Sequence, residues 1–335
     1  MPVSEKAKSI SFIIPTYNAG RHIECCLKSI RSQKYLGSEV EILVIDGGST
    51  DNTLEIAKRF GSKILNNPRR LAEYGVQIGI REASGEFSVV FAADNELSGN
   101  DWIKKVIETF EKYPDVCAVW GRLVSGENDT PLNKYFELIQ SDPLNWFLNK
   151  NLDQYKKNTR IKGTDIFLFR VEKNKPLVWG ANVLVYKADK IKRIWDQEGY
   201  LGDNDAFQYM IEQGNNKVAY FNTAFVYHHH VARLSDWVKK WRRNFIQHLL
   251  NQHKTRNLGW LFAGNFKGKL LIWIIYSSIP IFSLSHSVYL FIRDRNIHWF
   301  YHPMVSFLQF LTYCSLILSS KKGFNFVKGL ISNNA

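Results

Sequence analysis

The stretch VEILVIDGGSTDNT, residues 40–53, combines a buried strand, a glycine turn and a helix start. Its first seven residues are largely apolar and end on Asp46, and Gly47 and Gly48 let the backbone pass close to a ligand. Residues 49–51 (Ser-Thr-Asp) are of types that cap helix N-termini. A strand that ends in an acid and a turn indicates an α/β protein, in which ligands bind outside the carboxyl ends of the strands.

Strand and helix patterns alternate on both sides of this stretch. Apolar runs predict strands at residues 9–15, 40–46, 62–65, 87–92 and 116–120, and one or two final strands within 217–230; residues 177–186 are again apolar. Helical spacing of apolar residues predicts helices within residues 21–34, 51–60, 71–82, 101–110 and 202–214. The pattern is weak from 125 to 175, where residues 131–140 and 145–157 could be helices but lack a clean apolar face. We therefore expect an α/β fold with a mainly parallel twisted sheet flanked by helices.

A second strand, within VVFAADNEL (89–97), also runs into polar residues at its carboxyl end. Asp94, Asn95 and Glu96 follow the apolar run closely. A carboxylate at the mouth of a buried strand loses hydration and needs a partner, such as a metal ion or a cationic ligand.

Taken together, these motifs resemble the nucleotide-sugar domain of family 2 glycosyltransferases, which are inverting enzymes of GT-A fold. The resemblance rests on PTYN (15–18), DGGSTDNT (46–53), ASGEF (83–87) and the acidic cluster after residue 91, and it covers residues 9 to about 230. It implies that the donor nucleotide-sugar is bound by Pro15, Tyr17, Asp46, Gly47, Asp94, Asn95, Gly180 and Asn182.

The resemblance also implies Mg²⁺ or Mn²⁺ as cofactor, held by a D-x-D-type motif. The sequence departs from that motif at Ala92, where the first acid is expected, which leaves open whether metal is strictly required. Asp94 matches the metal-binding acid of the motif, and Glu96 is a minor candidate for a metal ligand. His228, in VYHHHVAR (226–233), matches a family histidine that ligates the metal; a surface run of histidines is the alternative.

GDNDAF (202–207) resembles the family's acidic pair that supplies the catalytic base. The spacing favours Asp203 as the base, with Asp205 as the second candidate. The other acid would interact with the helix N-terminus. The family's upstream arginine is missing at residues 75–77, so Arg69 and Arg70 are the nearest basic substitutes, unless they are a solvated loop pair.

Composition narrows the choice of partners. The 335 residues carry 44 Lys+Arg against 31 Asp+Glu, and the net charge of +13 favours nucleic acid, a phosphorylated small molecule or an anionic membrane. No known nucleic-acid motif accompanies the charge, so we expect no nucleic-acid partner. The four cysteines form neither a zinc nor a disulfide pattern and favour a reducing compartment, and MPVSEKAKSI lacks the apolar core of a secretory signal.

The C-terminal part of the chain changes character. Residues 270–292 and 299–320 contain no Asp, Glu, Lys or Arg and have the length of membrane spans, with basic residues flanking both runs. Residues 233–250 predict a basic amphipathic helix, either at a membrane surface or in a core with a solvated face. We expect a membrane hairpin with the catalytic domain on the cytoplasmic side of the cell membrane; two buried helices of a soluble domain are the alternative.

The predicted organisation is a GT-A domain at 1–232, with a nucleotide-binding half at 1–124 and an acceptor half at 125–232. Interface helices at 233–266 and the hairpin and tail at 267–335 follow. We expect inverting transfer of a sugar from a UDP- or GDP-sugar to a membrane-associated acceptor, a lipid-linked glycan or growing polysaccharide. The alternatives are a polyprenyl- or dolichyl-phosphate glycosyltransferase and a non-catalytic nucleotide-sugar-binding scaffold. The sugar, the acceptor, the linkage and the oligomeric state do not follow from the sequence.

Overall fold

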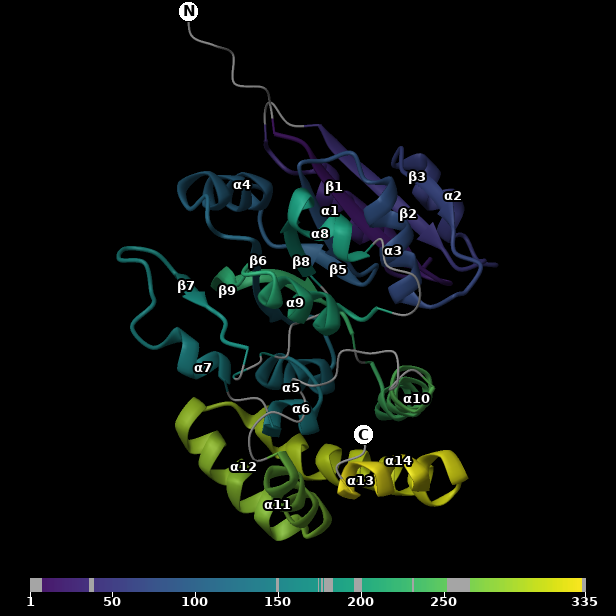
Figure 1. Cartoon of the computed structure of the whole chain (residues 1–335), viewed down its shortest axis with the longest axis vertical. Helices are drawn as coiled ribbons and strands as arrows, with labels where there is room; N and C mark the ends of the chain where they lie inside the picture. Colours follow the sequence, from purple (N-terminus) through teal and green to yellow (C-terminus); the bar gives the residue numbers. More distant parts are fainter. Residues whose placement is uncertain are drawn as a thin grey trace, which may run out of the picture. The chain divides into compact units, whose positions relative to one another are not determined.

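The structure is a computed structural model that describes residues 8–35, 39–148, 151–173, 175, 177, 183–195, 201–230, 232–251 and 266–332 (Figure 1). The chain divides into two compact units, of which the first comprises residues 1–124 and 151–228 and the second comprises 125–150 and 229–335. This division differs from the predicted one. Residues 125–150 contribute helices that pack with the C-terminal helices.

The first unit is built on one sheet, which has nine strands in the described part of the chain. The strands are β1 (Ile10–Thr16), β2 (Val40–Asp46), β3 (Lys63–Asn66), β4 (Phe87–Phe91), β5 (Asn95–Leu97), β6 (Ala118–Val124), β7 (Ile166–Arg170), β8 (Val183–Lys187) and β9 (Lys217–His228). Their order is β3-β2-β1-β4-β8-β6-β9-β5, and β7 pairs with β9.

Only part of this sheet is parallel. Strands β3, β2, β1 and β4 run parallel to one another, and β6 runs parallel to β9. The pairs β4–β8, β6–β8, β5–β9 and β7–β9 are antiparallel. The expectation of a mainly parallel sheet is therefore corrected to a mixed sheet. An apolar run in a sequence does not reveal the direction in which a buried strand pairs, which explains the difference.

The helices of the first unit pack on this sheet through their apolar faces. They are α1 (Ile23–Arg31), α2 (Thr53–Arg59), α3 (Ala72–Glu82), α4 (Trp102–Lys112), α7 (Asn151–Lys156), α8 (Ala188–Trp195) and α9 (Asp203–Glu212). The core that they share with the strands includes Ile13 of β1, Val90 of β4 and Tyr186 of β8.

Two glycines allow α3 to lie close against the strands. A Cβ built on Gly79 would lie 2.3 Å from Ile13 Cγ2, and one built on Gly75 would lie 3.0 Å from Pro15 Cβ. Side chains at these positions would therefore push the helix away from β1. The glycines that weaken the helical pattern of residues 71–82 in the sequence are the ones that the packing requires.

The second unit is helical in its described residues. Its helices are α5 (Pro131–Ile139), α6 (Pro143–Leu148), α10 (Leu234–Asn244), η1 (Phe245–Leu250), α11 (Phe266–Ser278), α12 (Pro280–Asp294), η3 (Ile297–Tyr301), α13 (His302–Leu318) and α14 (Lys321–Ser332). A buried aromatic cluster joins them: the Tyr135 ring contacts the rings of Trp237, Trp299 and His302.

The basic amphipathic helix predicted at residues 233–250 is present as α10 and η1. Its aromatic side chains at four-residue spacing, Trp237, Trp241 and Phe245, are buried. Its exposed side chains include Lys239, Arg242 and Arg243. The apolar face therefore belongs to the core of the second unit, and the basic face is exposed. Residues 252–265 of the predicted interface helices lie outside the described residues.

The two apolar runs do not form straight spans. In the described residues, no single helix is long and apolar enough to cross a bilayer. Two bent pairs reach that length and composition together, namely Phe266–Ser278 with Pro280–Asp294, at 92°, and Ile297–Leu318 with Lys321–Lys328, at 104°. Pro280 interrupts the first run, since it cannot donate the hydrogen bond that a continuous helix needs there. A membrane hairpin thus stays a prediction.

Candidate active site

The first part of the candidate site lies where β1 and β2 end side by side. Thr16 pairs with Asp46 at the last position of the ladder. The Asp46 carboxylate is buried and accepts hydrogen bonds from Gly48 N (2.8 Å), Ser49 N (2.9 Å) and Ser49 Oγ (2.5 Å). Asp46 therefore fixes its own turn, and because a carboxylate has about four lone-pair positions, it keeps acceptor capacity for a ligand.

The turns after β1 and β2 are bonded to each other. Asn18, at a φ of 49°, donates its backbone N–H to Ser49 Oγ (2.8 Å) and accepts from Thr50 N (2.8 Å) through its side chain. Gly20 N donates to Asp51 Oδ2 (2.9 Å). The PTYN and DGGSTDNT motifs thus form one hydrogen-bonded loop pair. The residues at 49–51, which were expected to cap a helix, take part in this pairing.

Tyr17 is the exposed aromatic of this loop pair, with 53% of its surface accessible. The Arg70 guanidinium carbon lies 5.8 Å from the centre of the Tyr17 ring, and Arg70 Nη2 would lie 3.5 Å from a Cβ on Gly48, whose φ is +87°. Arg70 itself has a φ of 57°, an uncommon conformation for a non-glycine residue. Of the two basic substitutes, Arg70 lies beside the predicted nucleotide residues, whereas Arg69 covers the Tyr74 ring at 4.2 Å.

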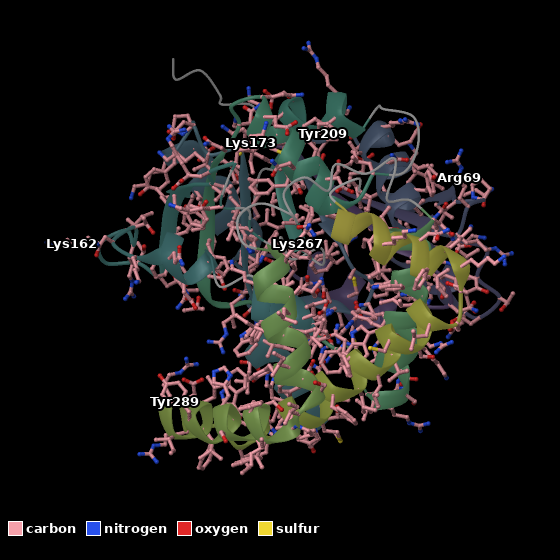
Figure 2. The ribbon with its side chains drawn as sticks, turned by 60° about the horizontal axis from the view of Figure 1, so that its bottom comes forward. Arg69, Lys162, Lys173, Tyr209, Lys267 and Tyr289 are labelled. Atoms are coloured by element: carbon pink, nitrogen blue, oxygen red, sulfur yellow. The ribbon has the colours of Figure 1, made fainter. Side chains whose placement is uncertain are left out.

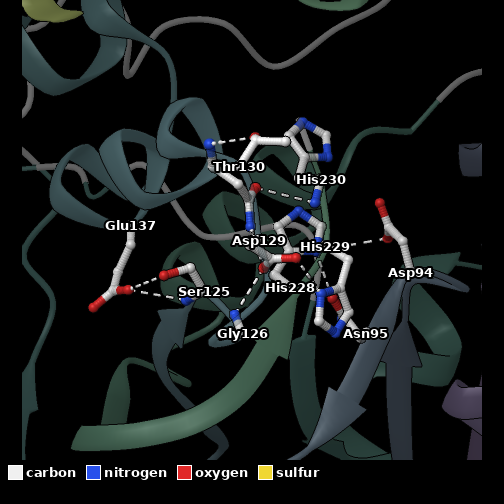
Figure 3. Close-up of polar contacts among 11 residues, drawn as sticks. Asp94, Asn95, Ser125, Gly126, Asp129, Thr130, Glu137, His228, His229 and His230 are labelled. Carbon is white, nitrogen blue, oxygen red and sulfur yellow. Dashed lines mark hydrogen bonds and ion pairs between the residues drawn. The ribbon is translucent and has the colours of Figure 1, made fainter. Parts of the chain in front are cut away.

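The second part of the candidate site lies after β4, in the turn that leads to β5 (Figure 3). Short strand β5 pairs with the end of β9, so that Asn95 lies opposite His228. His228 Nδ1 is 2.6 Å from Asn95 Oδ1 and 3.6 Å from Asp94 Oδ1. The structure therefore brings together Asp94, Asn95 and His228, which are predicted separately in the sequence.

A cysteine lies behind this turn. The Cys26 thiol on α1 donates a weak hydrogen bond to Ala92 O at 3.8 Å. Burial, reinforced by the negative charges of Asp94 and Glu96, raises the pKa of Cys26 well above its ordinary value. A neutral thiol thus supports the turn through the backbone of Ala92, the residue that replaces the family's first acid.

The donor set of Asp94 and His228 fits a divalent cation of the Mn²⁺ or Mg²⁺ type. Such ions take carboxylate oxygen, and Mn²⁺ also takes imidazole nitrogen. Nδ1 of His228 contacts the side-chain oxygen Oδ1 of Asn95, and in the tautomer that carries its proton on Nδ1 this bond fixes the ring and leaves Nε2 as the basic nitrogen, an arrangement common in metal-binding histidines. Asp94 and His228 are therefore the residues that would hold such an ion.

The three consecutive histidines have different partners, and β9 ends at His228, so His229 and His230 lie beyond the strand. His229 Nδ1 lies 2.8 Å from Asp129 Oδ1, within the second unit. His230 Nε2 lies 2.7 Å from Lys240 Nζ, also within the second unit. Figure 3 shows the three histidines, of which only His228 belongs to the first unit.

The two acids of α9 differ in environment. Asp205 is fully buried, and its Oδ2 accepts a hydrogen bond from Gly202 N at 3.1 Å, which caps its own helix. Asp203 is the first residue of α9 and is partly exposed. This difference favours Asp203 as the acid that can meet a substrate. The remaining predicted donor-site residues, Gly180 and Asn182, lie outside the described residues.

Two residues of the loop pair have contacts that the sequence reasoning missed. The Pro15 ring lies against Gly75 of α3 and holds the end of β1 on that helix. Asn18 joins the two turns through its backbone and its side chain. An asparagine in the turn that follows a strand is a signal for this role, because asparagine tolerates left-handed backbone and bonds to neighbouring turns.

Comparison with known proteins identifies the family. Residues 11–177 match the family model described as "Glycosyl transferase family 2". The chain belongs to glycosyltransferase family 2. It is therefore a transferase, and the matched range contains the loop pair and the turn that carries Asp94.

One relative matches this family 2 glycosyltransferase from end to end. It is "Dolichyl N-acetyl-alpha-D-glucosaminyl phosphate 3-beta-D-2,3-diacetamido-2,3-dideoxy-beta-D-glucuronosyltransferase" of Methanococcus voltae, 26% identical over 97% of this chain and 98% of its own length. "Glycosyltransferase AglE" of Haloferax volcanii is 34% identical, but the match covers 30% of this chain and 34% of that protein.

A solved structure supports the fold. A mannosyltransferase from Pyrobaculum calidifontis, solved in complex with GDP-mannose and Mn²⁺, matches with a TM-score of 0.54 over 95% of this chain and 89% of its own. The sequences are 14% identical, so the match concerns the fold alone. The first unit thus has the GT-A-type α/β fold, with the mixed sheet described above.

Proposed function

We propose that this glycosyltransferase moves a sugar, with inversion, from a UDP- or GDP-sugar to a lipid-linked glycan at a membrane. The observation that carries the proposal is the end-to-end match to the Methanococcus voltae protein, whose name gives a dolichyl-phosphate-linked sugar as its substrate. This match favours a lipid-linked acceptor over a growing polysaccharide. The proposal also puts the protein at the cell membrane, with its catalytic unit on the cytoplasmic side.

On the donor side, the loop pair and the Asp94 turn have separate tasks. Tyr17, Asp46 and Gly47 bind the nucleotide, with Arg70 beside them to meet its negative charge. Asp94 and His228 would hold a divalent cation, Mg²⁺ or Mn²⁺. Such a cation neutralises the charge that develops on the leaving diphosphate.

On the acceptor side, Asp203 acts as the general base. Its carboxylate takes the proton of the acceptor hydroxyl while that oxygen forms a bond to the anomeric carbon. The bond from this carbon to the diphosphate oxygen breaks on the opposite face, so the configuration inverts. General-base assistance of this kind contributes roughly 10²–10⁴-fold to the rate. Asp205 keeps the start of α9 folded and positions Asp203.

A second candidate acceptor is the lipid phosphate itself. The exposed face of α10 carries Lys239, Arg242 and Arg243, which suits an anionic lipid headgroup. A phosphate oxygen is already deprotonated at neutral pH, so this reaction does not need a general base. Asp203→Asn separates the two cases, since it slows attack by a hydroxyl much more than attack by a phosphate.

The direct test is a transfer assay with the detergent-solubilised full-length protein. Radiolabelled UDP- and GDP-sugars are offered with a dolichyl-phosphate-linked monosaccharide or with dolichyl phosphate, and the lipid product is measured with and without Mn²⁺. Label on the lipid-linked sugar, lost in Asp203→Asn, supports the proposal, and label on dolichyl phosphate supports the second candidate. Labelling of neither lipid, by a protein that binds nucleotide, would point to the scaffold alternative.

A further inference from the structure

The surface of α11 and α12 has an inverted distribution of polar and apolar side chains. On α12 the buried positions include Ser283 and Ser287, which are fully inaccessible, and most exposed positions are apolar. The exposed apolar residues of the pair and its bend are Leu271, Ile272, Ile274, Ile275, Ile279, Ile281, Phe282, Leu284, Val288, Tyr289 and Ile292. An apolar patch of this size with serines turned inward is typical of a surface that faces lipid and not water.

The hydroxyl groups of these helices are satisfied within the helices. Ser277 Oγ donates to Trp273 O (2.7 Å), and Ser287 Oγ donates to Ser283 O (2.9 Å). Ser285 is exposed, and its Oγ donates to Ile281 O at 2.8 Å. Such bonds let a serine lie in an environment without water, because the hydroxyl needs no outside partner.

Two backbone N–H groups at the bend have partners within the helices. Ile279 N donates to Ile275 O (3.1 Å), Phe282 N donates to Ile279 O (3.1 Å), and Pro280 has no N–H to satisfy. Non-helical backbone is costly in hydrocarbon only where its polar groups lack partners. The exposed side chains at the bend are apolar, with 65% of the Ile281 surface accessible.

Charged groups lie at the far ends of the pair. Lys267 and Lys269 lie in the first turn of α11, and Arg293 and Arg295 lie at the end of α12; all four side chains are exposed. Figure 2 labels Lys267 on α11 and, as a guide to α12, Tyr289. Asp294 pairs with Arg293 at 2.6 Å and neutralises part of this charge, and the remainder is positive. These positions suit the headgroups of an anionic leaflet.

The lengths fit one leaflet. Helices of 13 and 15 residues are about 20 Å long each, less than the roughly 30 Å of a hydrocarbon core. The two helices meet at 92°. If both far ends lie at the headgroups, the bend lies about 14 Å below them, which is about half the thickness of the hydrocarbon core.

We propose that α11 and α12 form a wedge that enters a single leaflet of an anionic membrane with the Pro280 bend foremost and returns to the same side. This replaces the predicted span over residues 270–292. The inference rests on the second unit alone and does not depend on which sugar or acceptor the first unit takes. The occupant of the apolar face is the acyl region of one leaflet.

The first experiment compares two isoleucines of nearly equal exposure. Ile281 is at the bend, and Ile297, 60% exposed, follows α12 at the level expected for headgroups. Full-length variants are mixed with phosphatidylcholine–phosphatidylglycerol vesicles, detergent is removed, and the vesicles are floated on a density gradient. Ile281→Asp should lower the vesicle partition coefficient by roughly 10²-fold, whereas Ile297→Asp should change it less than about threefold. Equal effects of the two variants, or no binding of the parent protein to vesicles, would overturn the proposal.

The second experiment decides between a wedge and a span. Lys269→Cys and Arg295→Cys are combined in a chain with Cys25→Ser and Cys314→Ser; Cys26 and Cys117 are buried. Intact vesicles are treated with a membrane-impermeant maleimide, and the mass of the intact protein is measured. A wedge gives molecules with two labels or none, whatever their orientation. One label per molecule would show that the helix pair spans the bilayer and would overturn the proposal. A dimer that forms without lipid and that Ile281→Asp dissociates would also overturn it, because the apolar face would then bind a second copy of the chain.

Discussion

Asp203 and Asp205 lie two residues apart in the first turn of α9, yet their surroundings differ. Asp205 is buried, and its carboxylate is occupied by the hydrogen bond from Gly202 N. Asp203 is partly exposed. A buried acid bonded to its own helix start has mainly a structural task, whereas a partly exposed acid at the same helix start can meet an acceptor hydroxyl.

These environments predict different effects of mutating the two acids. Asp203→Asn should lower kcat for a hydroxyl acceptor by roughly 10²–10⁴-fold with little change in melting temperature, because it removes the proton acceptor and keeps the side-chain shape. Asp205→Asn, in contrast to Asp203→Asn, should lower the melting temperature, because it weakens the cap of α9. Initial rates and thermal melts of both variants test this. A fully active Asp203→Asn variant would remove Asp203 from the mechanism.

The sequence predicts some of these side chains better than others. Asp94 and His228 are recognisable because each lies at the carboxyl end of a strand within a known order of motifs, and the structure places His228 Nδ1 3.6 Å from Asp94 Oδ1. The contact of Asn95 with His228 depends on two strands that pair across 133 positions, and no local pattern encodes such a pairing. The position of Arg70 beside Tyr17 is equally hard to predict, because only the fold brings the two residues together.

Among the helices and strands, the sequence locates best those with strong local periodicity. β2 is found at its predicted boundaries, and α3 matches its predicted range within one residue. The region from 125 to 175 was poorly predicted, and there β7 was missed. Its residues Ile166, Phe167 and Leu168 are only partly buried, so they lack the buried–exposed alternation that marks a strand. β5 was missed because three residues are too few for any pattern.

Packing between α3 and β1 gives a prediction about stability. Gly79→Val should lower the free energy of unfolding by about 1–3 kcal/mol, because the new side chain meets Ile13 and Ile45 in a filled core. Arg81→Val, on the exposed side of the same helix, should change it by about 0.5 kcal/mol or less. Urea unfolding of the two variants measures both values. A Gly79→Val protein as stable as the parent would contradict the close approach of α3 to the sheet.

A buried acid links two helices of the second unit. Asp142 accepts hydrogen bonds from Asn145 N (3.0 Å) at the start of α6 and from Gln309 Nε2 (2.8 Å) on α13. Burial raises the pKa of Asp142 above its ordinary value. The folded protein therefore holds this proton more tightly than the unfolded chain does.

The resulting pH effect has a defined sign. The contribution of Asp142 to stability is fully present below its unfolded pKa of about 3.9, and it is lost as the pH rises from there through the raised folded pKa. Asp142→Asn should remove this part of the pH dependence. Melting temperatures of both proteins in detergent, measured from about pH 4 upward, test it. Parallel curves would show that Asp142 does not titrate as described.

For the molecule as a whole, the sequence predicts the family, the α/β class and a change of character near the C-terminus. It does not predict that residues 125–150 group with the C-terminal helices, because that grouping depends on contacts such as Leu144 N to Gln309 Oε1, 165 positions apart. The apolar composition of residues 270–292 suggested one span, and only the right-angle bend at Pro280 shows that the stretch is two short helices.

The central claim is a metal-assisted nucleotide-sugar site built on Asp94 and His228. Calorimetric titration of the detergent-solubilised protein with UDP and GDP, with and without Mn²⁺, tests it most directly. Asp94→Ala is the test variant. Asp129→Asn is the matched control, because Asp129 also contacts a histidine, in the second unit.

We predict that Mn²⁺ tightens binding of one nucleotide by about tenfold or more, because a cation held by Asp94 and His228 would attract the negatively charged diphosphate. Asp94→Ala, but not Asp129→Asn, should abolish this gain. Nucleotide binding that is equally tight without Mn²⁺ and in Asp94→Ala would contradict the claim.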